Sequence, residues 1–521
     1  MKHILLLLIF LLASQIFFAQ NSKPAVTITN VNFDDQNKQV NITFDIEDID
    51  NNTSDVTLLF SENDGLNFTK IETANGDVGA SVPVGTDLQI NWSVQNELNG
   101  DGAYVFKVVA DDKESVQIEE IVAQVDQDKL QQDMLAVVGV RNRNDPDHLN
   151  EVKSLFETEL NDAGLLVEKQ SWTIDNYEAT NFIGTKSGLI EEDVIYINDA
   201  HYDTVPGSPG ADDNGSGVVG VLAGLKILSQ YDFEKTIKFI FFDMEEDGLV
   251  GSINYVSNIA MPQSLDIQGV LNYEMIGFYS DEKDSQSLPA GFEILFPEAY
   301  QAVINGGSRG NFITNIANVF SNPLKETFDE MAATYVPELR VISLAAIGNS
   351  EIAPDLRRSD HTPFWEAAYQ ALMISDGANF RNANYHEDTD TEETIDYDFM
   401  SNVVKATIAS LAHLAVPIHA GSDVATLDIT TSKLDVFEEE KIRIYPNLLT
   451  NTTRSIKIEQ TNLNVVFSTL SLYDINGLLI FKIKIPKDSI FELEIPNLES
   501  GVYLLQLAND SQSLTKYLVK Q

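Results

Sequence analysis

The sequence contains no cysteine among its 521 residues. Its stability must therefore come from hydrophobic cores and bound metal rather than from disulfide bonds. Basic residues are also few: 33 Lys and Arg stand against 80 Asp and Glu, for a formal net charge of −47. A surface this acidic repels phosphate backbones and anionic lipid, so we expect no nucleic-acid partner. Histidine occurs only seven times, which makes each histidine near an acidic cluster a candidate ligand.

Long apolar runs are absent after the N-terminus. No later stretch reaches the ~18 apolar residues of a membrane-spanning helix, so we expect no membrane insertion of the mature protein. At the start, the positive segment 1–3 precedes an apolar run at 4–12, and Ala19-Gln20 offers a small-residue cleavage site. We interpret residues 1–20 as a signal peptide. The remaining length exceeds one core and predicts about three units.

Two flanking segments show the period of β-structure. Within residues 21–125, Val40, Ile42 and Phe44 alternate with polar residues, and clusters of turn-forming residues separate such runs. This pattern predicts an N-terminal β-sandwich of the fibronectin or immunoglobulin type. After a polar linker at 421–435, residues 436–521 again read as strands, which predicts a C-terminal β-sandwich.

The central segment, residues 126–420, alternates between strand-like and helix-like patterns. Strands are expected at 194–198, 237–242, 269–272 and 371–374, and helices at 147–160, 218–228, 248–256 and 399–414. Such alternation predicts an α/β fold, an α/β/α sandwich with a mixed central sheet covered by helices on both faces. Ligands of these sheets gather beyond the carboxyl ends of the strands.

Acidic residues and histidines follow the first predicted strands. His201-Tyr202-Asp203 comes directly after the strand at 194–198. A neutral imidazole is a good zinc ligand, and a carboxylate two residues on can hydrogen-bond its other nitrogen. The loop at 209–217 then carries Asp212 and Asp213, whose charges repel each other unless a cation or solvent separates them. Either motif alone is often an ordinary turn, but two so close together indicate a metal site.

A third motif ends the strand at 237–242. Residues 243 and 245–247 are all acidic, and leaving such groups buried and unpaired is costly. One carboxylate can bind metal while its neighbour accepts a proton from water. In isolation the segment also fits a solvated helix start. Glu274 follows the strand at 269–272, and His386 lies in a later loop, so five motifs meet at the strand ends of one α/β unit.

In this order the motifs resemble those of a known family. His-x-Asp, Gly-Ala-Asp-Asp-Asn-x-Ser-Gly, Phe-Phe-Asp-x-Glu-Glu-x-Gly-Leu-x-Gly-Ser and a late Tyr-His are similar to the di-zinc exopeptidases of the bacterial leucyl aminopeptidase type. That family includes glutamate carboxypeptidases and, more distantly, glutaminyl cyclases, which depart from the loop that stands intact here. The resemblance covers about residues 130–418 and implies two Zn²⁺ ions per chain.

The resemblance also implies which residues hold the ions. The metal ligands would be His201, Asp213, Glu246, Glu274 and His386. His201 and Glu274 would bind one zinc, Glu246 and His386 the other, and Asp213 would bridge both. Each ion then has three protein ligands and an open position. Many family members have Asp where this chain has Glu274.

Three further residues receive catalytic roles from the resemblance. Glu245 would be the general base, and Asp203 would orient His201. Tyr385 matches a tyrosine of the glutamate carboxypeptidase branch that stabilises the tetrahedral oxyanion. The triplet Ser359-Asp360-His361 also fits a family motif, for which a helix start is the simpler reading.

The function implied is that of a secreted zinc-dependent exopeptidase. An aminopeptidase that cleaves N-terminal residues from peptides through a metal-bridged hydroxide fits best. A carboxypeptidase or aminoacylase on the same scaffold is the alternative, and a non-catalytic surface binding protein is a more distant one. The segments 444–447, 472–477 and 501–503 resemble the sorting domain of the type IX secretion system. That resemblance implies the type IX machinery as a partner and a secreted or cell-surface protein.

Overall fold

The computed structural model describes residues 22–429, apart from 51–52, 66, 95–101 and 350–351, and most of the strands within 442–520. The signal peptide expected at 1–20 lies outside the described residues. The chain divides into two compact units at Leu427. No helix in the described part of the chain is long and apolar enough to cross a membrane.

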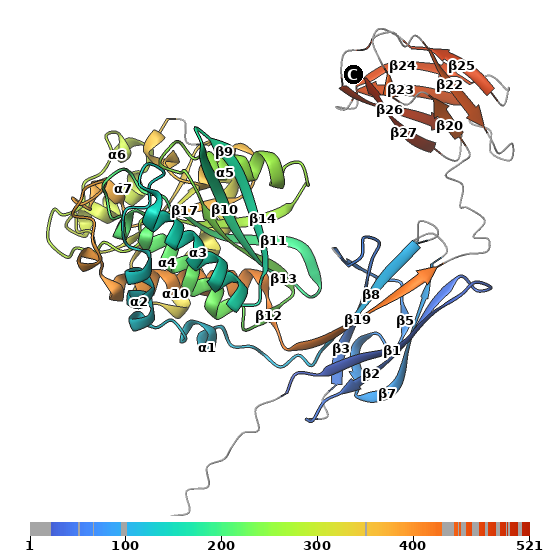
Figure 1. The fold of residues 1–521 in the computed structure, drawn as a ribbon, viewed down its shortest axis with the longest axis horizontal. Helices are drawn as coiled ribbons and strands as arrows, with labels where there is room; N and C mark the ends of the chain where they lie inside the picture. Colours follow the sequence, from blue (N-terminus) through green and yellow to red (C-terminus); the bar gives the residue numbers. More distant parts are fainter. Residues whose placement is uncertain are drawn as a thin grey trace, which may run out of the picture. The chain divides into compact units, whose positions relative to one another are not determined.

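The N-terminal strands form two antiparallel sheets (Figure 1). Their bounds are β1 (Ala25–Asp34), β2 (Gln39–Glu47), β3 (Thr53–Ser61), β4 (Thr69–Lys70), β5 (Asn75–Gly76), β6 (Gly79–Pro83), β7 (Gly85–Ser93) and β8 (Gly102–Asp111). The expected alternation is present, because Val40, Ile42 and Phe44 of β2 are fully buried. Trp92 of the β1-β2-β7-β5 sheet packs against Phe60 of the other sheet, with 5.0 Å between ring centroids.

One expected boundary is wrong. Residues 421–435 were predicted to form a linker, but β19 (Ala420–Ile429) is a strand beside β8 in the N-terminal sheet. Its residues alternate in exposure, and the backbone N–H of Ile28 in β1 donates to the Asp423 carboxylate at 2.7 Å. The prediction failed because β19 holds many polar residues on its exposed face, so its alternation reads as a polar stretch.

The centre of the chain forms an eight-stranded sheet in the order β16-β15-β17-β14-β11-β13-β10-β9. The strands are β9 (Leu166–Ile174), β10 (Tyr177–Lys186), β11 (Glu191–His201), β13 (Lys235–Phe242), β14 (Asp266–Tyr273), β15 (Ile313–Asn318), β16 (Val341–Ala346) and β17 (Ala371–Ser375). Strands β13, β11, β14 and β17 run parallel, whereas β10 is antiparallel to β13 and β15 is antiparallel to β17. The sheet is therefore mixed, as predicted.

Each face of this sheet is covered by its own hydrophobic core. The larger core holds α1 (Ile118–Val122), α2 (Gln127–Val137), α3 (Pro146–Asp162), α4 (Gly217–Leu228), α8 (Asn322–Tyr335) and α10 (Tyr397–Ala415). The other holds α5 (Val250–Tyr255), α6 (Phe292–Leu295), α7 (Pro297–Asn305) and α9 (His361–Glu366). Successive strand residues point to opposite faces, so Phe241 lies in the first core and Phe242 in the second. A short ladder of β12 (Asp232–Phe233) and β18 (Pro417–Ile418) lies outside the main sheet.

The parallel strands bring distant residues to one edge. His201, the last residue of β11, is in register with Phe242 at the end of β13. On the other side of β11, β14 ends at Tyr273, which is in register with Ile374 of β17. The motifs that follow β11, β13 and β14 must therefore meet at the same end of the sheet.

The C-terminal unit is built from two small sheets. One contains β20 (Ile442–Tyr445), β22 (Ser455–Gln460) and β25 (Ile490–Glu494). The other contains β21 (Leu448–Leu449), β23 (Thr469–Asp474), β24 (Leu479–Lys484), β26 (Gly501–Ala508) and β27 (Ser513–Lys520). Ile458, Leu472 and Leu505 are fully buried in one cluster, so this unit has its own core. Residues 446–447 and 475–477, parts of two predicted sorting motifs, lie outside the described residues.

Candidate metal centre and active site

His201 is held from one side by its own loop. Its Nδ1 lies 3.2 Å from the main-chain oxygen of Asp203 and 3.6 Å from the Asp203 carboxylate. The Asp203 carboxylate in turn accepts hydrogen bonds from the backbone N–H groups of Glu245 (2.9 Å) and Glu246 (3.1 Å). His201 Nε2 is buried and has no hydrogen-bond partner among the described residues. A contact on Nδ1 with Nε2 left free is the arrangement that metal-binding imidazoles use.

Asp213 lies in the turn (Ala211–Ser216) that leads into α4. The backbone N–H groups of Asp212 and Asp213 each donate to the Asp390 carboxylate at 3.0 Å. The side chain of Asn214 ties the same turn to the end of β14, because it donates to the Tyr273 carbonyl (2.8 Å) and accepts from Met275 N–H (3.0 Å). These contacts fix the position of Asp213 relative to Glu274.

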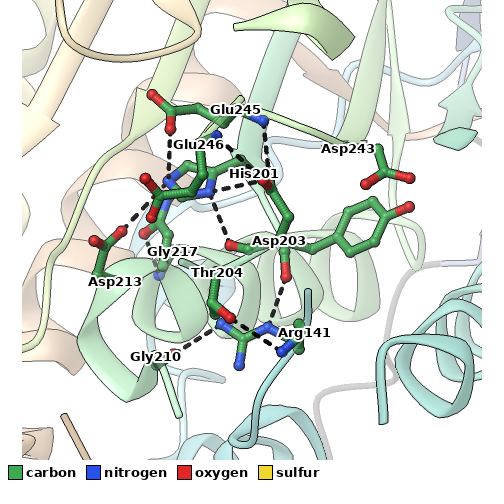
Figure 2. A network of polar contacts seen from close by, with 12 residues as sticks. Arg141, His201, Asp203, Thr204, Gly210, Asp213, Gly217, Asp243, Glu245 and Glu246 are labelled. Atoms are coloured by element: carbon green, nitrogen blue, oxygen red, sulfur yellow. Dashed lines mark hydrogen bonds and ion pairs between the residues drawn. The ribbon is translucent and has the colours of Figure 1, made fainter. Parts of the chain in front are cut away.

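Two groups of ligand atoms share Asp213. His201 Nε2 lies 3.5 Å from Asp213 Oδ1 and 3.4 Å from Glu274 Oε2. His386 Nε2 lies 3.1 Å from Asp213 Oδ2 and 3.3 Å from Glu246 Oε2. In each group the three ligand atoms lie within 4.8 Å of one another (Figure 2 shows His201, Asp213 and Glu246). The structure thus brings together all five predicted ligands, and Asp213 offers one oxygen to each group.

Glu245 belongs to neither group but lies beside them. Its Oε2 is 4.0 Å from His201 Nε2, and its side chain is buried. Burial raises the pKa of the Glu245 carboxyl well above its ordinary value, and the charges of Glu274 and Asp360 raise it further, against the effect of His201. A carboxylate close to a metal centre without being a ligand is available to accept a proton.

The electrostatics of the centre favour bound cations. Burial raises the pKa of Glu246 to about 7, and the nearby Asp213 carboxylate adds to the rise. Burial lowers the pKa of His386, but Asp213 and Glu246 raise it more, to a net value of about 10. The raised pKa of His386 shows that these carboxylates favour a positive charge beside them. Nitrogen and oxygen donors in groups of three match the ligand set of zinc.

Tyr385 lies directly beside the ligand His386. Its hydroxyl accepts a hydrogen bond from Arg358 Nη2 at 2.8 Å, and its ring stacks on His386 with 3.7 Å between centroids. Burial raises the pKa of the Tyr385 hydroxyl, and the Asp213 and Glu274 charges raise it further. The hydroxyl therefore keeps its proton at neutral pH.

Several residues around the centre had no predicted role. The Ser359 hydroxyl donates to Glu274 Oε2 at 2.7 Å, so the Ser359-Asp360-His361 triplet supports a ligand directly. Asp390, which lies 177 residues after Asp213, holds the Asp213 turn in place by accepting a hydrogen bond from the Asp213 backbone N–H. No sequence signal identifies Asp390, because its partners are backbone N–H groups, which every residue but proline carries.

A pocket opens beside Glu274, with an empty volume of about 750 Å³ that includes its solvent-open part. Its walls are mainly apolar and include Phe292, Val303, Phe312, Ile316, Leu344 and Met373. Arg358, Asp355 and Asn379 add polar groups. Most of these walls come from residues 286–358 and 373–380, where the sequence predicted only the strand at 371–374, although β15 and β16 carry the apolar residues of buried strands.

The fold and this site define a class of protein. A mixed sheet with imidazoles and carboxylates gathered beyond its parallel strands, around a buried shared aspartate, is the arrangement of an α/β metalloenzyme. Residues 181–411 match the sequence profile of Peptidase family M28. The predicted family resemblance is therefore confirmed.

Known proteins are similar over parts of the chain. Protein YfbL of Escherichia coli (strain K12) is 27% identical over 286 residues, covering 52% of this chain and 82% of YfbL. Aminopeptidase YwaD of Bacillus subtilis (strain 168) is 32% identical over 207 residues, covering 39% of this chain and 36% of YwaD. The solved structure of BSAP, a zinc aminopeptidase from Bacillus subtilis, is 25% identical with a TM-score of 0.35, covering 46% of this chain and 51% of BSAP.

The end of the chain matches a second profile. Residues 443–521 match the secretion system C-terminal sorting domain. The predicted resemblance of this segment is confirmed, and a sorting domain indicates export to the cell surface or the medium.

Proposed function

We propose that this chain is a secreted zinc aminopeptidase that removes single residues from the N-terminus of peptides. The observation that carries the proposal is the pair of ligand groups around Asp213, with the free carboxylate of Glu245 beside them. The family match and the names of two similar proteins, an aminopeptidase and a zinc aminopeptidase, support it.

Two zinc ions would fit the centre. His201 and Glu274 would hold one ion, Glu246 and His386 the other, and Asp213 both, as the two groups of donor atoms suggest. The buried and unpartnered Nε2 of His201 supports this assignment, because an orphaned buried nitrogen is costly without a metal or hydrogen bond. Bound zinc would supply a Lewis acid that polarises the scissile carbonyl and makes water more acidic.

The protein's own groups would move the proton and orient the site. Glu245 would accept a proton from the attacking water and deliver it to the leaving amine, because it is the close carboxylate outside both ligand groups. Asp203 would keep His201 in the tautomer that leaves Nε2 free. Tyr385, which keeps its proton, would donate a hydrogen bond to the oxyanion, with Arg358 supporting the hydroxyl.

The flanking parts would serve export. We infer a signal peptide at 1–20, a fibronectin- or immunoglobulin-like domain at 21–125, the peptidase domain at 126–420 and the sorting domain at 436–521. The N-terminal domain would also include β19, so the linker would begin after Ile429. The match at 443–521 supports the type IX secretion machinery as a partner.

Substrates with different ends test the assignment. The full-length chain without its signal peptide is incubated with leucine p-nitroanilide, its N-acetylated form and a peptide with a blocked N-terminus and a free C-terminus. We expect cleavage of the free-amine substrate alone, its loss after treatment with a chelator, and its return with Zn²⁺. Release of a C-terminal residue would indicate a carboxypeptidase, and removal of the acetyl group from the N-acetylated substrate would indicate an aminoacylase.

The pocket beside Glu274 predicts which N-terminal residues are preferred. Its apolar walls would receive the first side chain of the substrate, so leucine, methionine and phenylalanine p-nitroanilides should exceed the alanine compound in kcat/KM by about 10- to 200-fold. Leu344→Trp, which fills the pocket, should reduce turnover of the leucine, methionine and phenylalanine substrates and leave turnover of alanine p-nitroanilide unchanged. Equal values for alanine and leucine in the parent chain would contradict the preference.

A further inference from the structure

Arg141 lies before the family segment 181–411, in the turn that precedes α3. Its side chain is fully buried, with 0% exposure. The guanidinium donates hydrogen bonds to five main-chain carbonyl oxygens and to no carboxylate in this network. The acceptors are the carbonyls of Tyr202 (2.6 Å), Val137 (3.0 Å), Gly139 (3.0 Å), Pro209 (2.9 Å) and Gly210 (2.8 Å).

Three of these carbonyls, those of Tyr202, Pro209 and Gly210, belong to the two segments that carry metal ligands (Figure 2), whereas Val137 and Gly139 lie shortly before Arg141 in the chain. Tyr202 stands between His201 and Asp203, and Gly210 begins the turn that presents Asp213. The main chain of Arg141 holds the first segment as well, because its N–H donates to the Thr204 hydroxyl and its carbonyl accepts from Thr204 N–H, both at 3.0 Å. One side chain thus connects the His201 segment with the Asp213 turn.

The packing leaves little freedom around this connection. Gly210 has a φ of +60°, and a Cβ there would lie 2.4 Å from Thr204 Cγ2 and 2.9 Å from Arg141 Nη2. A residue larger than glycine would push the guanidinium away from the turn.

Arg141 also stays charged in this buried position. Burial lowers its pKa to about 10, and the charges of Asp390 and Asp213 oppose the fall. A buried charge is destabilising unless it is compensated, so a neutral side chain would serve better if the turn needed only packing. The carbonyls are spread over all three guanidinium nitrogens, with one on Nε, three on Nη1 and one on Nη2, and the single nitrogen of an ammonium cannot reach such an array.

We propose that Arg141 is a positioning residue for the metal centre: it fixes the separation of His201 and Asp213 and thereby the affinity of the His201–Asp213–Glu274 group for its ion. Arg141 does not bond the segments of Glu246 and His386, so the other group depends on it only indirectly, through Asp213 and through the Asp203 carboxylate that accepts from Glu246 N–H. The inference rests on the proposed zinc function and adds a residue outside the family segment to the machinery that holds the metal.

Zinc titration of the full-length chain against a competing chelator tests this role. Arg141→Gln and Arg141→Lys are both expected to weaken one of two zinc equivalents by about 10- to 100-fold, the usual effect of losing a residue that supports a ligand. The other equivalent should change much less. The lysine variant keeps the charge but cannot span five carbonyls.

The control is Lys153→Met. Lys153 is a half-buried cation that pairs with the Asp243 carboxylate at 3.2 Å and does not bond the main chain of either ligand segment. Its loss should leave both zinc affinities unchanged. Thr204→Val is a milder change that removes only the hydroxyl that accepts from Arg141 N–H. It should weaken the binding of the same zinc equivalent several-fold, and it replaces the Arg141 variants in the test if those do not fold.

The outcomes separate the alternatives. If Arg141→Lys still bound two zinc equivalents tightly, only the charge of residue 141 would matter. If Lys153→Met weakened zinc binding as much as the Arg141 variants do, the effect would be generally electrostatic. Either result overturns the proposal. A lower melting temperature of the metal-free Arg141 variants with unchanged zinc affinity would show a merely structural role. Failure of the parent chain to bind zinc would instead refute the proposed function itself.

Discussion

Glu245→Gln is expected to bind zinc as tightly as the parent chain and to lose about 100- to 10,000-fold in kcat. Glutamine has nearly the size of glutamate but cannot accept the proton of the attacking water. Glu245 lies outside both ligand groups, with its Oε2 4.0 Å from His201 Nε2, so the metal ligands should stay in place. The measurement combines kcat on leucine p-nitroanilide with the zinc content of the same preparation.

The neighbouring acid provides the control for this variant. Glu246 follows Glu245 directly, but its Oε2 lies 3.3 Å from His386 Nε2 in a ligand group. Glu246→Gln should therefore lose affinity for zinc as well as turnover. If Glu245→Gln kept comparable turnover, the proton would have to go to another group and the assigned base would be wrong.

Asp213→Ala is expected to lose both zinc equivalents, whereas His386→Ala should lose one. Asp213 offers Oδ1 to His201 and Oδ2 to His386, at 3.5 and 3.1 Å between the paired atoms, so its removal opens both groups. His386 takes part in one group only. Zinc stoichiometry at rising chelator concentration should show two equivalents in the parent chain, one in His386→Ala and none in Asp213→Ala.

Asp212→Asn is the matched control for that experiment. Asp212 is adjacent and equally buried, but its carboxylate accepts from Gly277 N–H (2.9 Å) and Asn382 Nδ2 (2.8 Å) and belongs to neither ligand group. It should keep both equivalents. Retention of both zinc ions by Asp213→Ala would mean that the shared carboxylate does not bridge, and the two-ion arrangement would have to be abandoned.

The sequence could locate the centre because its residues sit in short motifs after strands. A parallel sheet brings such strand ends together, so His201 and Glu274 meet although 73 positions separate them. The contacts that tune the centre were not predictable. The Asp203 carboxylate, for example, accepts a hydrogen bond from the backbone N–H of Glu245. Because the partner is a backbone group, the side chains of the sequence give no sign of this contact.

Two of the strands that were missed, β9 and β19, share a physical cause. Strand β9 lies at the edge of the central sheet, and its residues are exposed or half-buried. Strand β19 has the same character and was taken for a linker. Edge strands bury little apolar surface, so their hydrophobic signal is weak, whereas the central strands β11 and β13 carry long apolar runs.

Strand β19 sets a limit on how the exported protein can be trimmed. It follows the peptidase segment in sequence, yet it forms the edge of the β19-β8-β3-β4 sheet beside β8. The backbone N–H of Asp112, just after β8, donates a hydrogen bond to the carbonyl of His419, just before β19. The segment between these two strands, which contains the central sheet, therefore starts and ends at neighbouring points. If a protease removes the sorting domain, we expect the cut to fall after Ile429, because an earlier cut would strip a strand from the N-terminal sheet and expose the hydrogen-bonding edge of β8.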